Sequence, residues 1–404
     1  MNKVQLGVIF GSRSCEREVS IISAVQMMRY ADTEKYDVIP VYIHENGTWY
    51  TGEALKDVAS FQPFNPEAKG VEAVNLDLTS GSGALMAYRP GKGLFAQAKL
   101  EVVARLDVCV LVMHGLHGED GTLQGLLEMA NLPYTSTGVA GSAVGMDKIM
   151  MKQFFRGAGL PVLPGCWFLR SAFQKDAEQV MAQVEKELGY PVFVKPANLG
   201  SSIGVSRADD RTELKEALTL AFEYDRRVLV EKGLDRPMEL NCSVLGWDDE
   251  VEASPIEMPV STGNMLTFQG KYGSGGKGMA HLSRELPAKI GPELTEEIQQ
   301  LSMDIFRMMD CKGVVRIDYM FDSASEKVFI TEINTIPGSL AFYLWEAKGL
   351  KYSELIDRMV MYAQRAHEEK NSRNYAFTSN ILNSYSAGTK GAKGAKCAKL
   401  GGGT

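Results

Sequence analysis

The sequence lacks the features that mark several common classes of protein. Its six cysteines are widely scattered and form no C-x-x-C pair, which argues against a zinc site and against a disulfide-linked secreted domain. No apolar run approaches the length that spans a membrane, and no signal-like segment precedes the first predicted strand. We therefore expect a cytoplasmic protein with no membrane partner.

Acidic residues outnumber basic ones in the sequence, 50 to 43. The formal net charge is -7 over 404 residues, and no basic stripe precedes the tail, which argues against a nucleic-acid partner. A hydrophobic content of 45% and a charged content of 23% are those of an ordinary globular protein. The length is sufficient for two or three domains, each with its own core.

Two β-rich segments near the C-terminal end of the chain bring polar side chains together. Residues 314–320 and 328–338 read as strands, and a polar linker over 322–327 is long enough for a hairpin loop. Strand side chains alternate between faces, so in-register pairing would gather four side chains on one face: Arg316, Asp318, Glu332 and Asn334. Carboxylate and amide oxygens suit Mg²⁺, which in proteins commonly holds phosphates as well. The alternative is a surface hairpin with solvated charges.

The N-terminal part has the pattern of an open α/β sheet. A strand over Val4–Phe10 is followed by a glycine turn and by a helix start with Glu16 in its acidic first turn. Ligands of such sheets bind beyond the carboxyl ends of the strands, where Glu16 lies. A favourable interaction with the helix dipole explains Glu16 equally well.

The same alternation continues along the chain. Residues 36–42 predict a second strand, residues 46–100 have weak periodicity and predict an irregular decoration, and the apolar run 107–113 predicts a buried parallel strand. His114 follows that strand in a glycine-rich loop, which favours a ligand contact over a purely structural role. A helix is expected over 122–132.

The central part contains a candidate phosphate-binding loop. A strand over 190–196 ends on Lys195, and Gly200, Ser201, Ser202 and Gly204 follow it. Glycines let the backbone approach phosphate closely, and serines add hydroxyl donors. The pattern is neither a P-loop nor a G-x-G-x-x-G fingerprint, so a simple hairpin turn is the alternative.

The remaining elements are read from periodicity and composition. Residues 267–278 are glycine-rich and predict a mobile loop of the kind that folds over a bound substrate. Residues 384–404, with a lysine at every third position from 390 to 399, predict a disordered tail. We expect helices at 148 onward, 173–188, 213–222, 293–309, 339–348 and 353–369, and strands at 227–234 and 239–245.

Taken together, these motifs resemble the D-alanine–D-alanine ligase family of ATP-grasp enzymes over about residues 4 to 370. Any one of them could arise by chance, but seven occur in family order. The motifs are Glu16–Ser20, His114–Gly125, Met146-Asp147-Lys148, Lys195-Pro196 with Gly200–Gly204, Lys271-Tyr272, Arg316-Ile317-Asp318 and Glu332–Gly338.

The resemblance implies an ATP-grasp fold of class α/β and α+β. Its parts would be an N-terminal open parallel α/β domain (1–141), a central subdomain (142–237) and a C-terminal subdomain (238–375), before a disordered tail (376–404). ATP would be clamped between two antiparallel sheets. The residues implied at the nucleotide are Lys148 and Lys195 at the phosphates, Lys271 at the γ-phosphate, Ser201 in the glycine-rich loop, Glu231 and Lys232 at the adenine, and Glu239 at the ribose.

The resemblance also implies the substrates and the metal. Two Mg²⁺ ions, or Mn²⁺ in their place, would be held by Asp318, Glu332 and Asn334. The first D-alanine would be anchored by Glu16, with Ser201 and Tyr272 in contact with Glu16 and His114 near its carboxyl group. Arg316 and the Gly338 N–H would stabilise the oxyanion of the acyl-transfer step. A homodimer is usual for such ligases.

Two departures from the family pattern leave the acceptor open. Phe268-Gln269-Gly270 precede Lys271 where an acidic residue and an aromatic pair are usual, and the segment 339–344 is about four residues short where the second substrate's carboxylate is received. D-alanyl-D-alanine synthesis is the leading hypothesis. A related ligase with another acceptor, such as D-serine, D-lactate or another amine, is the alternative, although Tyr272 argues against D-lactate. A non-catalytic nucleotide-binding protein is disfavoured because no metal ligand or strand-end lysine is lost.

Overall fold

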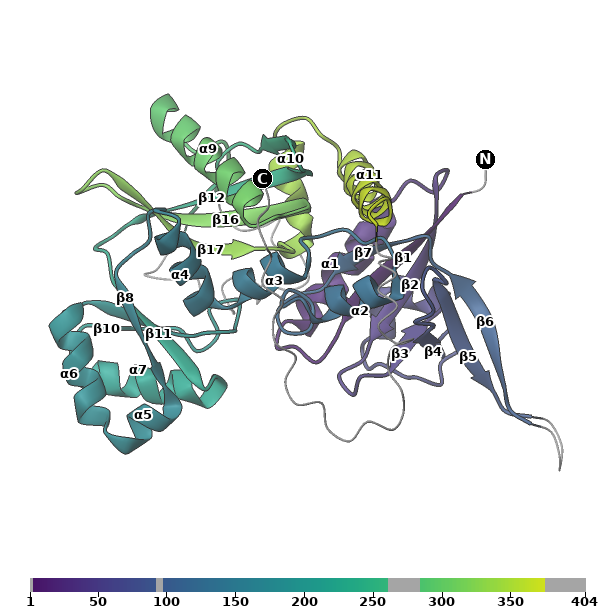
Figure 1. The fold of residues 1–404 in the computed structure, drawn as a ribbon, viewed down its shortest axis with the longest axis horizontal. Helices are drawn as coiled ribbons and strands as arrows, with labels where there is room; N and C mark the ends of the chain where they lie inside the picture. Colours follow the sequence, from purple (N-terminus) through teal and green to yellow (C-terminus); the bar gives the residue numbers. More distant parts are fainter. Residues whose placement is uncertain (1–2, 92–96, 261–283, 375–404) are drawn as a thin grey trace, which may run out of the picture. The chain divides into compact units, whose positions relative to one another are not determined.

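The computed structural model describes residues 3–91, 97–260 and 284–374 (Figure 1). Residues Met1–His367 form one compact unit. The predicted loop at 267–278, with Lys271 and Tyr272, and the predicted tail at 384–404 lie outside the described residues. Within the described ranges, none of the helices has both the length and the apolar character needed to cross a membrane.

A seven-stranded mixed sheet carries the N-terminal part, in the order β6-β5-β4-β3-β2-β1-β7. Strand β1 pairs in parallel with β2 and β7, as expected, while β3 to β6 extend the sheet antiparallel. The prediction of an irregular 46–100 region is wrong for β3, β4 and β5, because such short strands show little periodicity. The bounds are β1 Val4–Gly11, β2 Tyr36–Ile43, β3 Trp49–Thr51, β4 Glu72–Leu76, β5 Ala84–Arg89, β6 Lys99–Arg105 and β7 Val108–Val112.

Helix α1 (Arg17–Tyr30) follows β1 and packs against β1 and β7 (Figure 1). Every residue of β7 is buried, as the continuous apolar run predicts. Helix α2 (Thr122–Ala130) follows the loop after β7. Because β1 and β7 are adjacent and parallel, the residues after their carboxyl ends, Glu16 and His114, meet at one edge of the sheet.

A second, four-stranded antiparallel sheet has the order β10-β9-β11-β8. Along β9, Val192 and Val194 enter a core with helices α6 and α7, while Phe193 and Lys195 face the other side. The single helix expected over 173–188 is two helices, because Asp176 ends α5 and its side chain caps α6. The bounds are β8 Gly165–Leu169, α5 Arg170–Lys175, α6 Ala177–Glu187, β9 Val192–Pro196, β10 Ser206–Ala208, α7 Arg211–Tyr224 and β11 Arg227–Lys232.

A third sheet, also antiparallel, has the order β13-β12-β16-β17. Its core residues pack with α4 and α9. Asp147 caps α4 by accepting hydrogen bonds from the N–H groups of Ile149 and Met150. The bounds are α4 Lys148–Gly157, β12 Met238–Trp247, β13 Glu250–Ala253, α9 Pro292–Met308, β16 Gly313–Asp322 and β17 Lys327–Asn334.

Short elements complete the described chain. Two small strands, β14 and β15, pair with each other. After β17 the chain forms a 3-10 turn, η4, and two helices, and α1 packs against η4. The bounds are η1 Glu53–Lys56, η2 Val58–Ser60, α3 Val139–Met146, β14 Met258–Pro259, β15 Arg284–Glu285, η4 Gly338–Ala341, α10 Phe342–Glu346 and α11 Tyr352–Asn371.

Candidate active site

A cavity of about 770 Å³ lies between the two antiparallel sheets. The second sheet contributes β9 and β10 to its wall, and the third sheet contributes β12, β16 and β17. Loops after β1 and β7 add Glu16, His114 and Glu119. The predicted site residues that line it are Glu16, His114, Lys148, Lys195, Ser201, Glu239, Arg316, Asp318, Glu332, Asn334 and Gly338.

Strand register arranges the cavity wall in three layers. Arg316 lies opposite Asn334, Asp318 opposite Glu332, and Met320 opposite Glu239 of β12. Alternate residues of a strand are about 6.6 Å apart, so the layers follow one another along β16 at that spacing. The register confirms that the arginine, the two carboxylates and the amide share one face.

A β-bulge in β17 turns Glu332 and Asn334 towards the cavity. Asp318 pairs with Glu332, but the next residue, Tyr319, pairs with Ile330, so Thr331 is the extra residue. Its hydroxyl donates to the Asp318 carbonyl oxygen at 2.7 Å. Buried positions are even before the bulge, at 328 and 330, and odd after it, at 333. Glu332 therefore faces the cavity instead of the core.

The Asp318 carboxylate joins two of the layers. Arg316 donates to both of its oxygens, from Nε at 2.6 Å and from Nη2 at 2.7 Å, and Asn334 Nδ2 donates at 3.1 Å. Burial lowers the pKa of Arg316, but attraction by Asp318 outweighs burial, so the net pKa is raised and the guanidinium stays charged.

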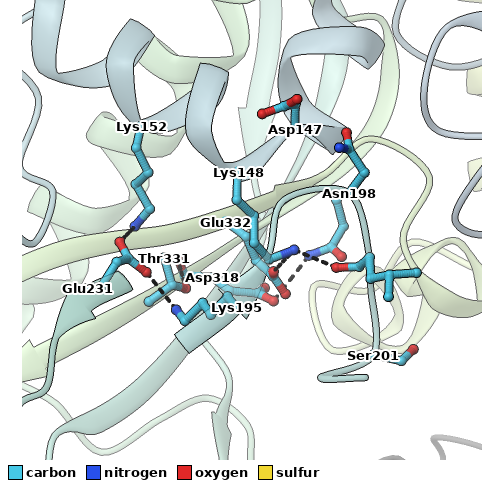
Figure 2. A network of polar contacts seen from close by, with 12 residues as sticks. Asp147, Lys148, Lys152, Lys195, Asn198, Ser201, Glu231, Asp318, Thr331 and Glu332 are labelled. Atoms are coloured by element: carbon cyan, nitrogen blue, oxygen red, sulfur yellow. Dashed lines mark hydrogen bonds and ion pairs between the residues drawn. The ribbon is translucent and has the colours of Figure 1, made fainter. Parts of the chain in front are cut away.

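Glu332 and Lys148 face each other across the cavity (Figure 2). Lys148 Nζ lies 3.5 Å from Glu332 Oε2 and donates to the Leu199 carbonyl oxygen at 2.6 Å. Within the described ranges, no cluster of three or more His, Cys, Asp and Glu side chains fit for a metal ion is found. The predicted set has two carboxylates and one amide, and all three side chains line the cavity. Such hard oxygen donors beside a lysine fit Mg²⁺ that is shared with phosphate oxygens.

Lys195 is held by the carboxylate of Glu231, which lies between Lys195 and Lys152 (Figure 2). Glu231 accepts from Lys195 Nζ at 2.7 Å and forms an ion pair with Lys152 Nζ at 2.8 Å. Burial raises the pKa of Glu231, but attraction by the two lysines outweighs burial and lowers its pKa to about 2. The Glu231 side chain is 2% exposed and does not line the cavity, so a contact with adenine would have to come from its backbone. Lys232 instead donates to the Tyr190 carbonyl oxygen at 2.7 Å.

Glu16 and Ser201 come together from parts of the chain that are distant in sequence. The Ser201 hydroxyl donates to Glu16 Oε1, and Glu16 is buried. A Cβ atom at Gly200 would lie 2.5 Å from Glu16 Oε2, and one at Gly115 would lie 2.7 Å from the same oxygen. A side chain at either glycine would therefore displace the Glu16 carboxylate from this position.

His114 is buried, and both nitrogens of its ring lie within hydrogen-bond distance of protein atoms. Nδ1 lies 3.1 Å from the Ile336 carbonyl oxygen, and Nε2 lies 3.3 Å from the Ser23 hydroxyl. Burial lowers the pKa of His114 to about 4, so the imidazole is neutral at neutral pH. His114 lines the cavity, but it also fixes the chain after β17.

The shortened segment after β17 contributes one side chain, that of Tyr343, to the cavity wall. Of the described residues 338–344, Gly338 and Tyr343 line the cavity. The Tyr343 hydroxyl donates to Glu257 at 2.9 Å, and the Arg284 guanidinium carbon lies 4.1 Å from the centre of the Tyr343 ring. Arg284 and Glu257 also line the cavity, and Arg284 Nη1 lies 3.0 Å from Glu257 Oε1.

Comparison with known proteins identifies the family. The model of the D-ala D-ala ligase N-terminus matches residues 5–137, and that of the D-ala D-ala ligase C-terminus matches residues 154–361. A D-alanine–D-alanine ligase of Thermosipho africanus is 36% identical over 379 residues, which cover 94% of this chain and 98% of that protein. The chain belongs to the D-alanine–D-alanine ligase family. Another member, from Bacillus velezensis, is 37% identical over 373 residues, which cover 91% of this chain and 100% of that protein.

Solved structures of this family have the same fold. The D-alanine-D-alanine ligase from Coxiella burnetii is 28% identical, has a TM-score of 0.74, and the match covers 92% of this chain and 97% of that one. The VanG D-Ala:D-Ser ligase from Enterococcus faecalis is also 28% identical, with a TM-score of 0.74 and coverage of 90% and 100%. The predicted ATP-grasp fold is therefore confirmed, and the chain is an ATP-dependent ligase of the D-alanine–D-alanine ligase family.

Three parts of this ligase's site were not predicted from the sequence. Lys152 is an ordinary helix lysine in the sequence, and only its position one turn after Lys148 could have drawn attention. Glu119 belongs to the glycine-rich loop of His114, and burial with neighbouring Glu16 raises its pKa to about 8. Arg284 and Glu257 carry no local signal.

Proposed function

We propose that this ligase joins two D-alanine molecules to give D-alanyl-D-alanine for peptidoglycan synthesis in the cytoplasm, with release of ADP and phosphate. The observation that carries the proposal is the layered wall of the cavity, in which Glu239, the Asp318–Glu332 pair and Arg316 follow one another along the third sheet. In this order Glu239 would face the ribose of ATP, the Asp318–Glu332 pair its phosphates, and Arg316 the centre of acyl transfer.

In the first step, a carboxylate oxygen of D-alanine attacks the γ-phosphorus of ATP. An oxygen–phosphorus bond forms, the bond from the γ-phosphorus to the bridging oxygen breaks, and ADP leaves with D-alanyl phosphate as the other product. Lys148 and Lys195 balance negative charge on the phosphates, where the transition state spreads it over the phosphoryl oxygens. Glu16 receives the ammonium group of the first D-alanine. The Ser201 hydroxyl orients the Glu16 carboxylate for this contact.

Asp318, Glu332 and Asn334 would hold two Mg²⁺ ions, or Mn²⁺ in their place. Bound there, such ions would supply positive charge that neutralises the phosphate oxygens. Arg316 keeps one side of Asp318 fixed, so that the carboxylate is presented to the cavity in one orientation.

In the second step, the amine of the second D-alanine attacks the carbonyl carbon of D-alanyl phosphate. A carbon–nitrogen bond forms, the bond from carbon to the phosphate oxygen breaks, and the ammonium proton is lost to solvent overall. Charge develops on the carbonyl oxygen, beside Arg316 and the Gly338 N–H. His114 is neutral at neutral pH, so it adds no positive charge to help stabilise this oxygen.

The acceptor's carboxylate is received at the same end of the cavity. Ser339 and Leu340 are not among the lining residues, so Arg316 carries this recognition, with Tyr343 beside it. A site that satisfies a carboxylate discriminates strongly against analogues that lack one. We expect the acceptor site to be weaker or broader than the donor site, and D-serine is the first alternative acceptor to consider.

The test is an ATP-dependent coupling assay with products identified by mass. D-alanine alone should give D-alanyl-D-alanine and one ADP per dipeptide, whereas L-alanine should give neither. A panel of D-serine, D-lactate and simple amines, each with D-alanine, then measures acceptor breadth. No dipeptide from D-alanine with any partner would overturn the proposal. Sedimentation of the purified chain tests the proposed homodimer.

A further inference from the structure

The turn after β17 has a backbone that needs support from outside. Ser339, Leu340 and Ala341 have φ values of 50°, 55° and 50°, so three successive residues other than glycine adopt the left-handed conformation. That conformation is disfavoured for L-residues, and it persists where surrounding structure fixes it. Gly338, which lines the cavity, begins this turn.

Residues of the N-terminal sheet's loop hold both backbone groups of Ile336, just before the turn. The Ile336 N–H donates to Glu119 Oε1 at 3.1 Å, and Glu119 Oε2 accepts from the Gly115 N–H at 2.9 Å. The Ile336 carbonyl oxygen lies 3.1 Å from His114 Nδ1. A carbonyl oxygen only accepts, so Nδ1 of His114 carries the hydrogen.

Ser23 of α1 completes the chain of hydrogen bonds. With the hydrogen on Nδ1, the neutral ring's Nε2 is an acceptor, and the Ser23 hydroxyl donates to it at 3.3 Å. Ser23 Oγ in turn accepts from the Ser339 N–H at 3.2 Å. Ser23 is 2% exposed, so water does not readily replace either bond.

We propose that Ser23 is a positioning residue for the acyl-transfer step. Through His114 and the Ser339 N–H it fixes the Ile336–Leu340 turn, and thereby the place of the Gly338 N–H beside the reacting carbonyl group. The inference rests on the proposed function. It assigns Ser23 no contact with either substrate and no part in the phosphoryl transfer from ATP.

The chain offers a matched control one helical turn away. Ser20 is also on α1 and fully buried, but its hydroxyl accepts from the Gly11 N–H at 2.8 Å and donates to the Val112 carbonyl oxygen at 2.6 Å. These bonds lie within the N-terminal sheet and its helix. Ser20→Ala therefore removes a buried serine without touching the turn.

The experiment compares Ser23→Ala and Ser20→Ala in the two half-reactions. Scrambling of ¹⁸O between bridge and non-bridge positions of ATP, in the presence of D-alanine, reports D-alanyl phosphate formation. Mass analysis of D-alanyl-D-alanine reports the second step. We expect Ser23→Ala to keep isotope exchange within about twofold and to slow dipeptide formation on the order of tenfold to a hundredfold, because small misplacement of a reacting group costs that much.

Hydrogen exchange followed by mass spectrometry provides a second readout that does not depend on turnover. The peptide covering 336–341 should exchange faster in Ser23→Ala and at the wild-type rate in Ser20→Ala. If Ser23→Ala does not fold, Ser23→Cys and Ser20→Cys replace the pair with the same expectations. Equal losses in both half-reactions, or equal effects of the two positions, would overturn the inference. Absence of dipeptide from the wild-type chain would instead overturn the proposed function.

Discussion

The buried Glu231 is the shared counter-ion of two lysines, and its removal should be more damaging than removal of either lysine's charge. Glu231 is 2% exposed, and Lys152 and Lys195 are 4% and 14% exposed. Glu231→Gln leaves two cations close together with no carboxylate between them. Lys152→Met leaves one carboxylate with one cation, which is a balanced pair.

The structure sets the magnitudes. Breaking a buried ion pair by removing one partner costs roughly 3–5 kcal/mol, and we expect this loss for Glu231→Gln. Lys152 also donates to the Ile330 carbonyl oxygen at 2.7 Å, so Lys152→Met should cost about 1–3 kcal/mol for the carbonyl left without that donor. The double variant Glu231→Gln/Lys152→Met no longer holds two unpaired buried cations. Its loss in free energy of unfolding should therefore be smaller than the sum of the losses in the two single variants.

Urea unfolding at pH 7 without nucleotide measures the free energy of unfolding of each variant. The dependence of that free energy on urea concentration should be compared between variants. The pH dependence provides a check of sign. The pKa of Glu231 is about 2, below the ordinary value of 4.5, so its stabilising contribution is present above pH 4.5 and is lost as the pH falls towards 2. The stability gap between wild type and Glu231→Gln should therefore narrow over that window. Additive losses of stability in the double variant, or a larger loss for Lys152→Met than for Glu231→Gln, would refute the role of Glu231 as a shared counter-ion.

Three further predictions follow from the site. Glu332→Gln should abolish phosphate release with the fold intact by circular dichroism, and near-normal turnover would contradict its role as a metal ligand. Lys195→Ala should weaken ATP binding about tenfold to a hundredfold, the value of one charge-assisted hydrogen bond, and unchanged affinity by calorimetry would count against it. The pKa of His114 is about 4, below the ordinary 6.5, so the stability that the neutral ring contributes should be lost as the pH falls from 6.5 to 4. The imidazole proton resonance of His114 in the wild-type protein, assigned by its absence from the His114→Gln spectrum, should show no titration above pH 5.

Local pattern was enough to predict the parts of the site that lie on single strands or directly after them. Arg316 and Asp318 alternate on one strand, so their common face follows from the period of two. Lys195 lies near the end of a strand in another sheet, just before the glycine-rich loop. Glu16 and His114 follow adjacent parallel strands, so their meeting follows from the α/β pattern.

Features that depend on distant segments could not be predicted in the same way. The contact of Glu231 with Lys152 requires the packing of α4 against β11, which nothing in either segment specifies. The left-handed turn at Ser339 has no glycine after Gly338 to mark it, and it is held by Ser23, more than three hundred residues earlier. The bulge at Thr331 was readable in part, because the apolar positions change from even to odd there.

That bulge makes the length of β17 as important as its composition. Thr331 acts as a spacer, and replacing it by another small residue would leave the strand's facing unchanged. Deleting it would restore a regular ladder in which Glu332 directly follows Ile330, so Glu332 and Asn334 would still face the cavity and Ile333 the core. With the bulge kept, one further residue between Thr331 and Glu332 would instead turn Glu332 and Asn334 into the hydrophobic core and Ile333 into the cavity. A single codon gained beside the bulge would thus invert the facing of Glu332 and Asn334 while removing neither of them.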